Sequence, residues 1–304
     1  MNYYTVQNDI CVEENVDFDL EKTLFCGQCF RFKQLKPNIF SGVVLNKHVI
    51  FLKVKNKIYF KNVLEKDFKN IWFKFFDFKR NYSKIFRKII DVNPDLMRVA
   101  EFSRGIRILK QHPWEVLCSF IFSQNNNIPR ISKIIKNFCQ RFGKEISPGN
   151  FSFPLPEDLK NLALRDLDFL KSGFRAKYII DALEKLTSKK VILKDLEFKS
   201  TKEARNILMT IKGVGPKVAD CTLLYGFGRF DAFPIDTWVA KSLNIFFKKV
   251  KPEVLKNLAG LAQQYIFYYM RSNSLIYKTS SANPDVKILC TDVSKKLSKR
   301  KNLI

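Results

Sequence analysis

The chain has 304 residues, of which 54 are lysine or arginine and 29 are aspartate or glutamate, so its formal net charge is +25. A charge of that size creates a potential of several kT over the surface and favours a polyanionic partner. No run of about 18 apolar residues is present, so nucleic acid is a better partner than membrane. A genome that over-uses Lys, Asn, Ile and Phe is the alternative explanation of the same charge.

The cysteines indicate a reducing compartment, because all seven are scattered and no secretory signal peptide precedes them. Cys26 and Cys29 have C-x-x-C spacing, but no second cysteine or histidine pair completes a zinc site. Only Cys221 and Cys290 lie in the C-terminal third, which is too few for an iron–sulfur cluster. The sequence therefore predicts no metal and no cofactor.

The N-terminal part predicts an antiparallel sheet, because β-forming residues alternate or cluster around turns at Asn46 and Asn56. Its predicted strands are Phe40–Val44, His48–Val54 and Lys57–Val63. Between Asp67 and Ile90 the apolar residues change to helical spacing, and the pattern stays helical after Pro94. The predicted helices are Glu115–Ser123, Ile128–Phe142, Pro156–Leu170, Ala176–Leu186, Thr201–Ile211, Pro216–Tyr225, Thr237–Phe247 and Glu253–Arg271.

These patterns predict an α+β protein with two domains. We expect an antiparallel β domain with flanking helices at residues 1–95 and a mostly α-helical domain at residues 96–279. The remaining residues, 280–304, carry many lysines and little hydrophobic period, which is typical of a mobile basic tail.

A glycine hairpin joins two predicted helices. Ser200 and Glu203 have capping-box spacing, and the helix they begin is expected to run to Lys212. Gly213-Val214-Gly215 interrupts it, and Pro216 suits the first position of the next helix. Two glycines let the backbone approach a ligand, and the N–H groups that follow form an anion site suited to a DNA phosphate. A simple turn between helices is the alternative.

Lys217 lies in the first turn of the second helix, beside the positive end of the helix dipole. That field disfavours an ammonium and makes the nucleophilic amine more accessible, and it also favours a thiolate at Cys221, one turn later. The alternative is a solvated surface lysine. Asp236 begins another helix, and as an isolated residue it is best explained as an N-cap.

The residues from Ile211 to Cys221, followed by Pro234-Ile235-Asp236, resemble the helix-hairpin-helix and Gly/Pro-Asp signature of the DNA glycosylase superfamily. The 8-oxoguanine branch is the most similar, and the resemblance covers about residues 10 to 272. It implies a TATA-binding-protein-like antiparallel β domain joined to a helical domain. It also implies that Lys217 attacks C1′ and forms a Schiff base, while Asp236 stabilises the oxocarbenium charge and assists deprotonation.

The resemblance further implies a base pocket. Cys26 to Phe32 is similar to the family's G-Q-x-F-R segment, in which the carbonyl of the glycine, here Gly27, accepts the N7–H that only 8-oxoguanine carries. Gln263 would read the Watson–Crick edge of the extruded base, and Phe267 would stack on it opposite Cys221 and Lys217. The alternatives are a strand with a glycine bulge for Gly27 and a core aromatic for Phe267.

DNA contacts are implied by two other segments. The residues Asn125-Asn126-Asn127 resemble the family's Asn run, in which Asn125 would fill the space left by the flipped base, and Arg130 would read the opposite cytosine. Phe174 would be the wedge, and Arg175 would donate to that cytosine. Gly213 and Gly215 would hold phosphate. Many eukaryotic members carry His where this chain has Trp238, so Trp238 is expected to pack or to make only a weak phosphate contact.

The function implied is a bifunctional glycosylase and lyase that removes 8-oxoguanine from duplex DNA, opposite cytosine, and cleaves the strand by β-elimination. A glycosylase for alkylated bases that uses Asp alone and a non-catalytic DNA-binding protein are the alternatives. The expected partner is double-stranded DNA, with no membrane and a monomeric protein. The expected location is the cytoplasm, at the nucleoid, in a bacterium, or the nucleus in a eukaryote.

Overall fold

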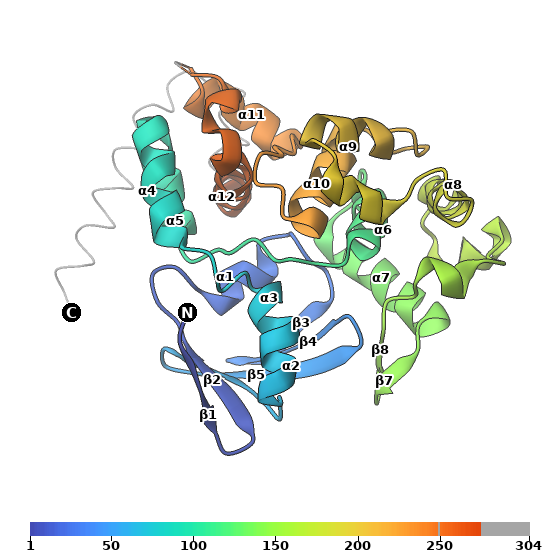
Figure 1. Cartoon of the computed structure of the whole chain (residues 1–304), viewed down its shortest axis with the longest axis horizontal. Helices are drawn as coiled ribbons and strands as arrows, with labels where there is room; N and C mark the ends of the chain where they lie inside the picture. The colour runs from blue at the N-terminus through green and yellow to red at the C-terminus, as the bar shows by residue number, and fades with distance from the viewer. Residues whose placement is uncertain (249, 275–304) are drawn as a thin grey trace.

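The computed structural model describes residues 1–248 and 250–274, which form a sheet domain and a larger helical domain (Figure 1). Among these residues, six antiparallel strands make one sheet in the order β1-β2-β6-β5-β4-β3. They are β1 Tyr3–Val6, β2 Asp9–Glu13, β3 Phe32–Lys36, β4 Ile39–Val44, β5 Lys47–Val54 and β6 Lys57–Phe60. The predicted fold class is therefore confirmed, and the three predicted strands correspond to β4, β5 and β6.

A helical segment covers one face of the sheet. It consists of α2 (Glu65–Asp67), the π-helical turn η1 (Phe68–Trp72) and α3 (Phe73–Phe75). The ring of Phe68 lies 5.1 Å from that of Phe60, and the ring of Trp72 lies 6.2 Å from that of Phe51, both edge to face. This aromatic layer explains why the spacing of apolar residues changes from strand to helix period near Asp67.

The second domain is built mainly from helices (Figure 1). α1 (Leu20–Phe25) packs in the core of the sheet domain, and the other α-helices are α4 Tyr82–Val92, α5 Met97–Ser103, α6 Pro113–Ser123, α7 Ile128–Phe142, α8 Arg175–Thr187, α9 Thr201–Leu208, α10 Pro216–Phe227, α11 Thr237–Phe246 and α12 Ala259–Ser272. The 3₁₀ segments are η2 Pro94–Leu96, η3 Pro156–Leu159, η4 Leu164–Leu170, η5 Leu193–Phe198 and η6 Pro252–Leu258, and a hairpin pairs β7 (Glu145–Ser147) with β8 (Asn150–Phe151). Every residue of α6 from Trp114 to Phe122 is buried, so α6 is the central helix of this domain.

Two predicted helices were wrong. Pro156–Leu170 is not one helix but the separate 3₁₀ segments η3 and η4. Asp158 accepts the backbone N–H of Leu155 and Asp166 that of Ala163, so each aspartate caps the start of a new short helical segment. The predicted helix Glu253–Arg271 is also divided, since Lys256 has a left-handed φ of 44° and the regular helix α12 begins only at Ala259. The predicted basic tail lies outside the described residues.

The two domains share extensive contacts. Tyr82, Phe86 and Ile89 of α4 precede residue 96, yet they are buried in the core of the helical domain. Arg107 is 2% exposed and donates to the backbone carbonyls of Asp17, Phe76, Asp77 and Arg80. The domain boundaries stay predictions. No helix within residues 1–248 and 250–274 is long and apolar enough to cross a membrane.

Candidate active site

The hairpin between α9 and α10 is held from both sides. The predicted capping box begins α9, where Glu203 N donates to Ser200 Oγ at 3.2 Å and Ser200 N donates to Glu203 Oε2 at 2.9 Å. The helix ends at Leu208 rather than at Lys212, and the turn is anchored by the buried side chains of Ile211 and Val214. No side chain caps α10 among the described residues, so its first N–H groups are available to an anion.

Replacing Gly213 with alanine is expected to destabilise the protein by about 2–4 kcal/mol. Gly213 has a φ of +78°, and an added Cβ would lie 2.2 Å from the ring of Tyr178. Gly215 is the matched control, because an added Cβ meets nothing within 4 Å. Denaturant unfolding of the two alanine variants measures the difference, and equal stability of both would show that the hairpin does not need its tight turn.

Lys217 is oriented by the end of α6. Its Nζ donates to Ser123 Oγ at 3.1 Å and lies 4.6 Å from the centre of the Phe120 ring. Ser123 Oγ in turn donates to the Phe120 carbonyl at 2.8 Å, which fixes the acceptor. The amine is therefore held in place by a hydroxyl and an aromatic face and has no carboxylate salt bridge among the described residues.

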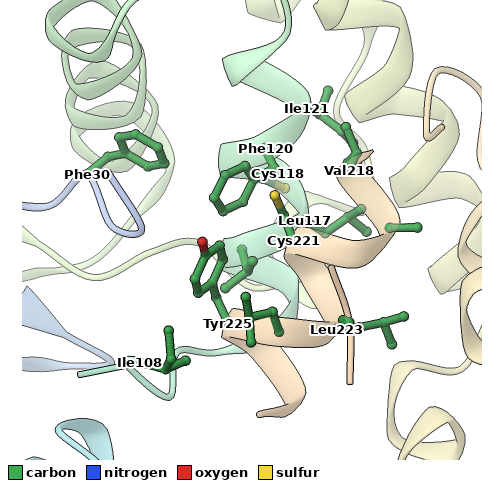
Figure 2. Close-up of a cluster of buried hydrophobic side chains, with 14 of the residues drawn as sticks. Phe30, Ile108, Leu117, Cys118, Phe120, Ile121, Val218, Cys221, Leu223 and Tyr225 are labelled. Carbon is green, nitrogen blue, oxygen red and sulfur yellow. The ribbon is translucent and has the colours of Figure 1, made fainter. Parts of the chain in front are cut away.

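Cys221 lies on α10, one turn after Lys217. Its side chain packs against α6, near Cys118 and Phe120 (Figure 2). Its burial raises the pKa of the thiol to about 12, and the nearby Lys217 opposes that rise only in part. The predicted thiolate was therefore wrong. Apolar packing outweighs the helix dipole at this position, and Cys221 presents a neutral thiol to the cavity.

Asp236 is both an N-cap and a cavity residue. Its Oδ1 accepts from the backbone N–H of Trp238 at 3.0 Å and of Val239 at 2.8 Å, which begins α11. Burial raises the pKa of the carboxyl, while the Val239 N–H and Lys217 oppose the rise. Both of these bonds are made by Oδ1, and no other described residue donates to Oδ2, so the second oxygen faces the cavity side of the cap free to meet a ligand.

A cavity of about 920 Å³ brings the two groups together. Lys217 and Asp236 both line it, as do the predicted base-pocket residues Gly27, Cys221, Gln263 and Phe267, together with Asn125 and Trp238. A cavity of this size accommodates a nucleoside. The sequence prediction that the amine and the carboxylate face one purine-sized space is therefore consistent with the geometry.

The loop that carries Gly27 is clamped by α12. Gly27 has a φ of +93°, and a Cβ at this position would lie 2.8 Å from the ring of Phe267. Gln264 Nε2 donates to the Cys26 carbonyl at 3.2 Å, and Arg271 Nη2 donates to the Phe25 carbonyl at 2.7 Å. Only glycine fits this approach, so the backbone at residue 27 faces the aromatic wall of the cavity.

Gln263 is the polar group at the other end of that wall. It is 3% exposed, and its Oε1 is buried without a hydrogen-bond partner among the described residues. A buried amide oxygen without a partner costs about 1–3 kcal/mol, a cost that a bound ligand can remove. Such a group is best explained as an acceptor reserved for a ligand.

Family models match nearly the whole of this arrangement. The model described as the N-terminal domain of 8-oxoguanine DNA glycosylase matches residues 10–117. The model of the HhH-GPD superfamily of base excision DNA repair proteins matches residues 118–264. The chain belongs to the 8-oxoguanine DNA glycosylase family.

Solved structures of the family are similar over their whole length. MBOgg1 in complex with a low-affinity DNA ligand has a TM-score of 0.82 and 39% identity, covering 89% of this chain and 98% of that one. Clostridium acetobutylicum 8-oxoguanine glycosylase/lyase, bound to double-stranded DNA with cytosine opposite 8-oxoguanine, has a TM-score of 0.82 and 33% identity over 90% and 99%. The N-glycosylase/DNA lyase of Saccharomyces cerevisiae is 40% identical in an alignment of length 159, which covers 45% of this chain but only 41% of the yeast protein.

In this family member the predicted DNA-contact residues Asn125 and Trp238 line the cavity, whereas Phe174, Arg130 and Arg175 do not. Phe174 is 47% exposed, and Arg130 donates to the Lys171 carbonyl at 3.0 Å. Arg175 was predicted to donate to cytosine, but here it donates to the carbonyls of Gln124, Asn125 and Ser172. In this glycosylase fold Arg175 thus stabilises the start of the Asn run through hydrogen bonds, and its contact with cytosine stays a prediction.

Trp238 lines the cavity beside Asp236, where its backbone N–H helps to fix the carboxylate. Lys241 Nζ lies 5.6 Å from the centre of its ring. The Lys241 ammonium, one turn along α11, therefore lies near the face of the indole. The indole itself is uncharged and has a single N–H donor. The predicted weak phosphate contact of Trp238 stays a prediction.

Among the cavity residues that sequence reasoning missed, two hold other parts of the site in place. Ser123 fixes the amine of Lys217, and Arg271 holds the Gly27 loop. Ser123 directly precedes the Asn run, and Arg271 follows Gln263 at helical spacing, so both had a detectable signal. The part of the chain that the structure describes contains no group of three or more His, Cys, Asp or Glu residues that could hold a metal ion.

Proposed function

We propose that the chain is a bifunctional DNA glycosylase and AP lyase that excises 8-oxoguanine from duplex DNA, with cytosine as the preferred opposite base. One observation supports this most directly: Lys217 and Asp236 line the same cavity as Gly27, Gln263 and Phe267. An amine and a carboxylate are the groups needed to cleave the glycosidic bond. A backbone acceptor, an amide and an aromatic ring are the groups needed to bind a purine base.

In the proposed reaction, the Lys217 amine attacks C1′ while the bond from C1′ to the base breaks and its electron pair leaves with the base. The ionised Asp236 stabilises the positive charge that develops on the sugar. Loss of a proton and opening of the ring give an iminium, which acidifies the C2′ proton. Removal of that proton expels the 3′ phosphate by β-elimination and nicks the strand.

Base selection is proposed to depend on one backbone acceptor. The Gly27 carbonyl would accept N7–H of 8-oxoguanine, whereas guanine presents an unprotonated N7 that repels it. An unpaired acceptor costs about 1–3 kcal/mol, so guanine is disfavoured by at least that amount. The preference for cytosine is supported by the Clostridium relative, which was solved with cytosine opposite 8-oxoguanine. We also propose a monomer that acts at the nucleoid in a bacterium or in the nucleus of a eukaryote.

Borohydride trapping distinguishes this proposal from its alternatives. The protein should become covalently linked to duplexes that contain 8-oxoguanine, and most rapidly to those with cytosine opposite. Removal of methylated purines without trapping would instead favour an alkylated-base glycosylase. Binding with neither activity would favour a non-catalytic protein.

Binding to undamaged duplex is expected to weaken steeply with salt. Each phosphate that the protein neutralises contributes about −0.9 to the slope of log K against log salt concentration. A titration of fluorescent duplex at several salt concentrations measures that slope. A flat dependence would show that the net charge of +25 reflects composition and not DNA contact.

A further inference from the structure

One face of α12 contributes three side chains to the cavity. Gln263, Phe267 and Arg271 are spaced four residues apart, which places them on the same side of the helix, and all three line the cavity. The proposed function uses Gln263 and Phe267. It gives no role to the guanidinium of Arg271, the charged group at the far end of this face.

Arg271 is only partly satisfied. Its Nη2 donates to the Phe25 carbonyl at 2.7 Å, whereas Nη1 is buried and has no hydrogen-bond partner among the described residues. No carboxylate forms a salt bridge with it in that part of the chain. A buried cationic donor without an acceptor is costly, so a ligand is the natural source of the missing acceptor.

An unused donor is not a general property of the described arginines, although Arg104 Nε, away from this cavity, also lacks a partner. Arg107 donates through Nε, Nη1 and Nη2 to backbone carbonyls. Arg175 does the same with all three nitrogens. Arg271 therefore differs from them in having its unused donor at the wall of a cavity.

The unused donor lies beside the Gly27 loop. Nη1 is 3.0 Å from the position that a Cβ on Gly27 would occupy, and the guanidinium carbon lies 5.4 Å from the centre of the Phe267 ring. If the base stacks on Phe267 with its N7–H toward Gly27, the edge next to Arg271 carries O6 and O8. These two keto oxygens flank N7–H and are the acceptors that Nη1 lacks.

We propose that Arg271 is a specificity-determining residue whose Nη1 donates to a keto oxygen on the N7 edge of the flipped base. This inference rests on the proposed function. Arg271 and the Gly27 carbonyl together would recognise a keto oxygen next to N7–H. Unoxidised guanine lacks the N7–H and therefore does not provide this pattern. A charge-assisted hydrogen bond of this kind is stronger than a neutral one.

The contact also strengthens during the reaction. As Lys217 Nζ bonds to C1′, the bond from C1′ to N9 breaks, and its electron pair stays on the base and spreads onto the keto oxygens. The proton that the amine loses then neutralises the base. A cation beside a keto oxygen stabilises this charge more than it stabilises the bound substrate, so excision depends on Arg271 more than binding does.

Single-turnover kinetics of Arg271→Met test the proposal on two duplexes, one with 8-oxoguanine opposite cytosine and one with a preformed abasic site. Excision is expected to fall by about 10- to 150-fold, while strand cleavage at the abasic site stays within about twofold of the parent. Arg271→Lys keeps the charge without the planar fork and should recover part of the loss. Arg229→Met is the matched control, because Arg229 also donates to backbone carbonyls but does not line the cavity.

Equal losses on both duplexes would overturn the proposal, because they would show that Arg271 acts only by holding the Phe25 carbonyl. Unchanged excision by Arg271→Met would overturn it as well. Failure of the parent protein to excise 8-oxoguanine is a different result, since it contradicts the proposed function itself.

The identity of the keto oxygen follows from binding to 8-oxoadenine, which keeps O8 and N7–H but has an amino group in place of O6. Affinities are measured in the Lys217→Gln background, where no excision occurs. If Arg271→Met weakens binding of 8-oxoadenine and 8-oxoguanine by the same factor, the acceptor is O8. If only 8-oxoguanine is affected, the acceptor is O6.

Discussion

Replacing Lys217 with glutamine is expected to abolish borohydride trapping on 8-oxoguanine duplex and to lower strand cleavage by at least about 10³-fold. An amide nitrogen is not nucleophilic and cannot form the iminium that borohydride reduces. Glutamine is shorter than lysine and also polar, so it fits the half-buried position against Phe120 and Ser123 without a new charge. Gel separation of trapped and free protein measures the effect.

Lys212→Gln is the matched control for this variant. Lys212 lies on the same hairpin, is exposed and does not line the cavity, so its loss should leave trapping intact. Binding of the Lys217→Gln protein to the same duplex should also persist, since the phosphate contacts do not depend on the amine. Residual trapping at the parent rate would mean that another amine is the nucleophile.

Asp236→Asn is expected to lower excision by about 10²- to 10⁴-fold while the protein stays folded. The asparagine oxygen can still accept from the N–H groups of Trp238 and Val239, so the cap of α11 remains. Only the negative charge near the sugar is lost. Single-turnover kinetics give the rate, and thermal unfolding gives the stability.

Asp236 also predicts the direction of the pH dependence. Burial raises the pKa of this carboxyl, so the folded protein holds the proton more tightly than the unfolded chain does. The stability that this group contributes is fully present below its unfolded pKa of about 3.9 and is lost as pH rises through the higher folded value. Excision, which needs the ionised carboxylate, should fall as pH drops through that same folded value.

The asparagine variant should accordingly unfold at the parent's temperature or above it at pH 7, because it removes a desolvated charge. Asp236→Ala is the comparison, since it removes the charge and the cap together, and a lost N-cap costs about 1 kcal/mol. A clear loss of stability in the asparagine variant, equal to that of the alanine variant, would contradict this account.

Local signals predicted much of the site. Lys217 and Asp236 each occupy the first turn or the cap of a helix, and such positions follow from glycine, proline and capping residues nearby in the chain. Gln263 and Phe267 share a helix face for the same kind of reason, since spacing along one helix determines which side chains are neighbours. Strands β4 to β6 were also found from alternation and turns.

Properties that depend on distant contacts were not predictable in this way. The neutral thiol of Cys221 results from packing against α6, a helix about a hundred residues earlier. Arg175 binds the Asn run across the fold, which no spacing within its own segment reveals. Strands β1 and β2 were missed because both are short. β1 is an edge strand that pairs only with β2, and the second partner of β2 is β6, far along the chain.

The clamp between α12 and the Gly27 loop has a consequence for the life of the protein in the cell. Contacts from Gln264 and Arg271 reach back over 238 and 246 residues to Cys26 and Phe25. A chain still emerging from the ribosome, or one cut before α12, lacks both the wall behind the damaged base and a helix buried in the core of the helical domain. The base pocket is therefore completed only at the end of synthesis, together with the core that supports it.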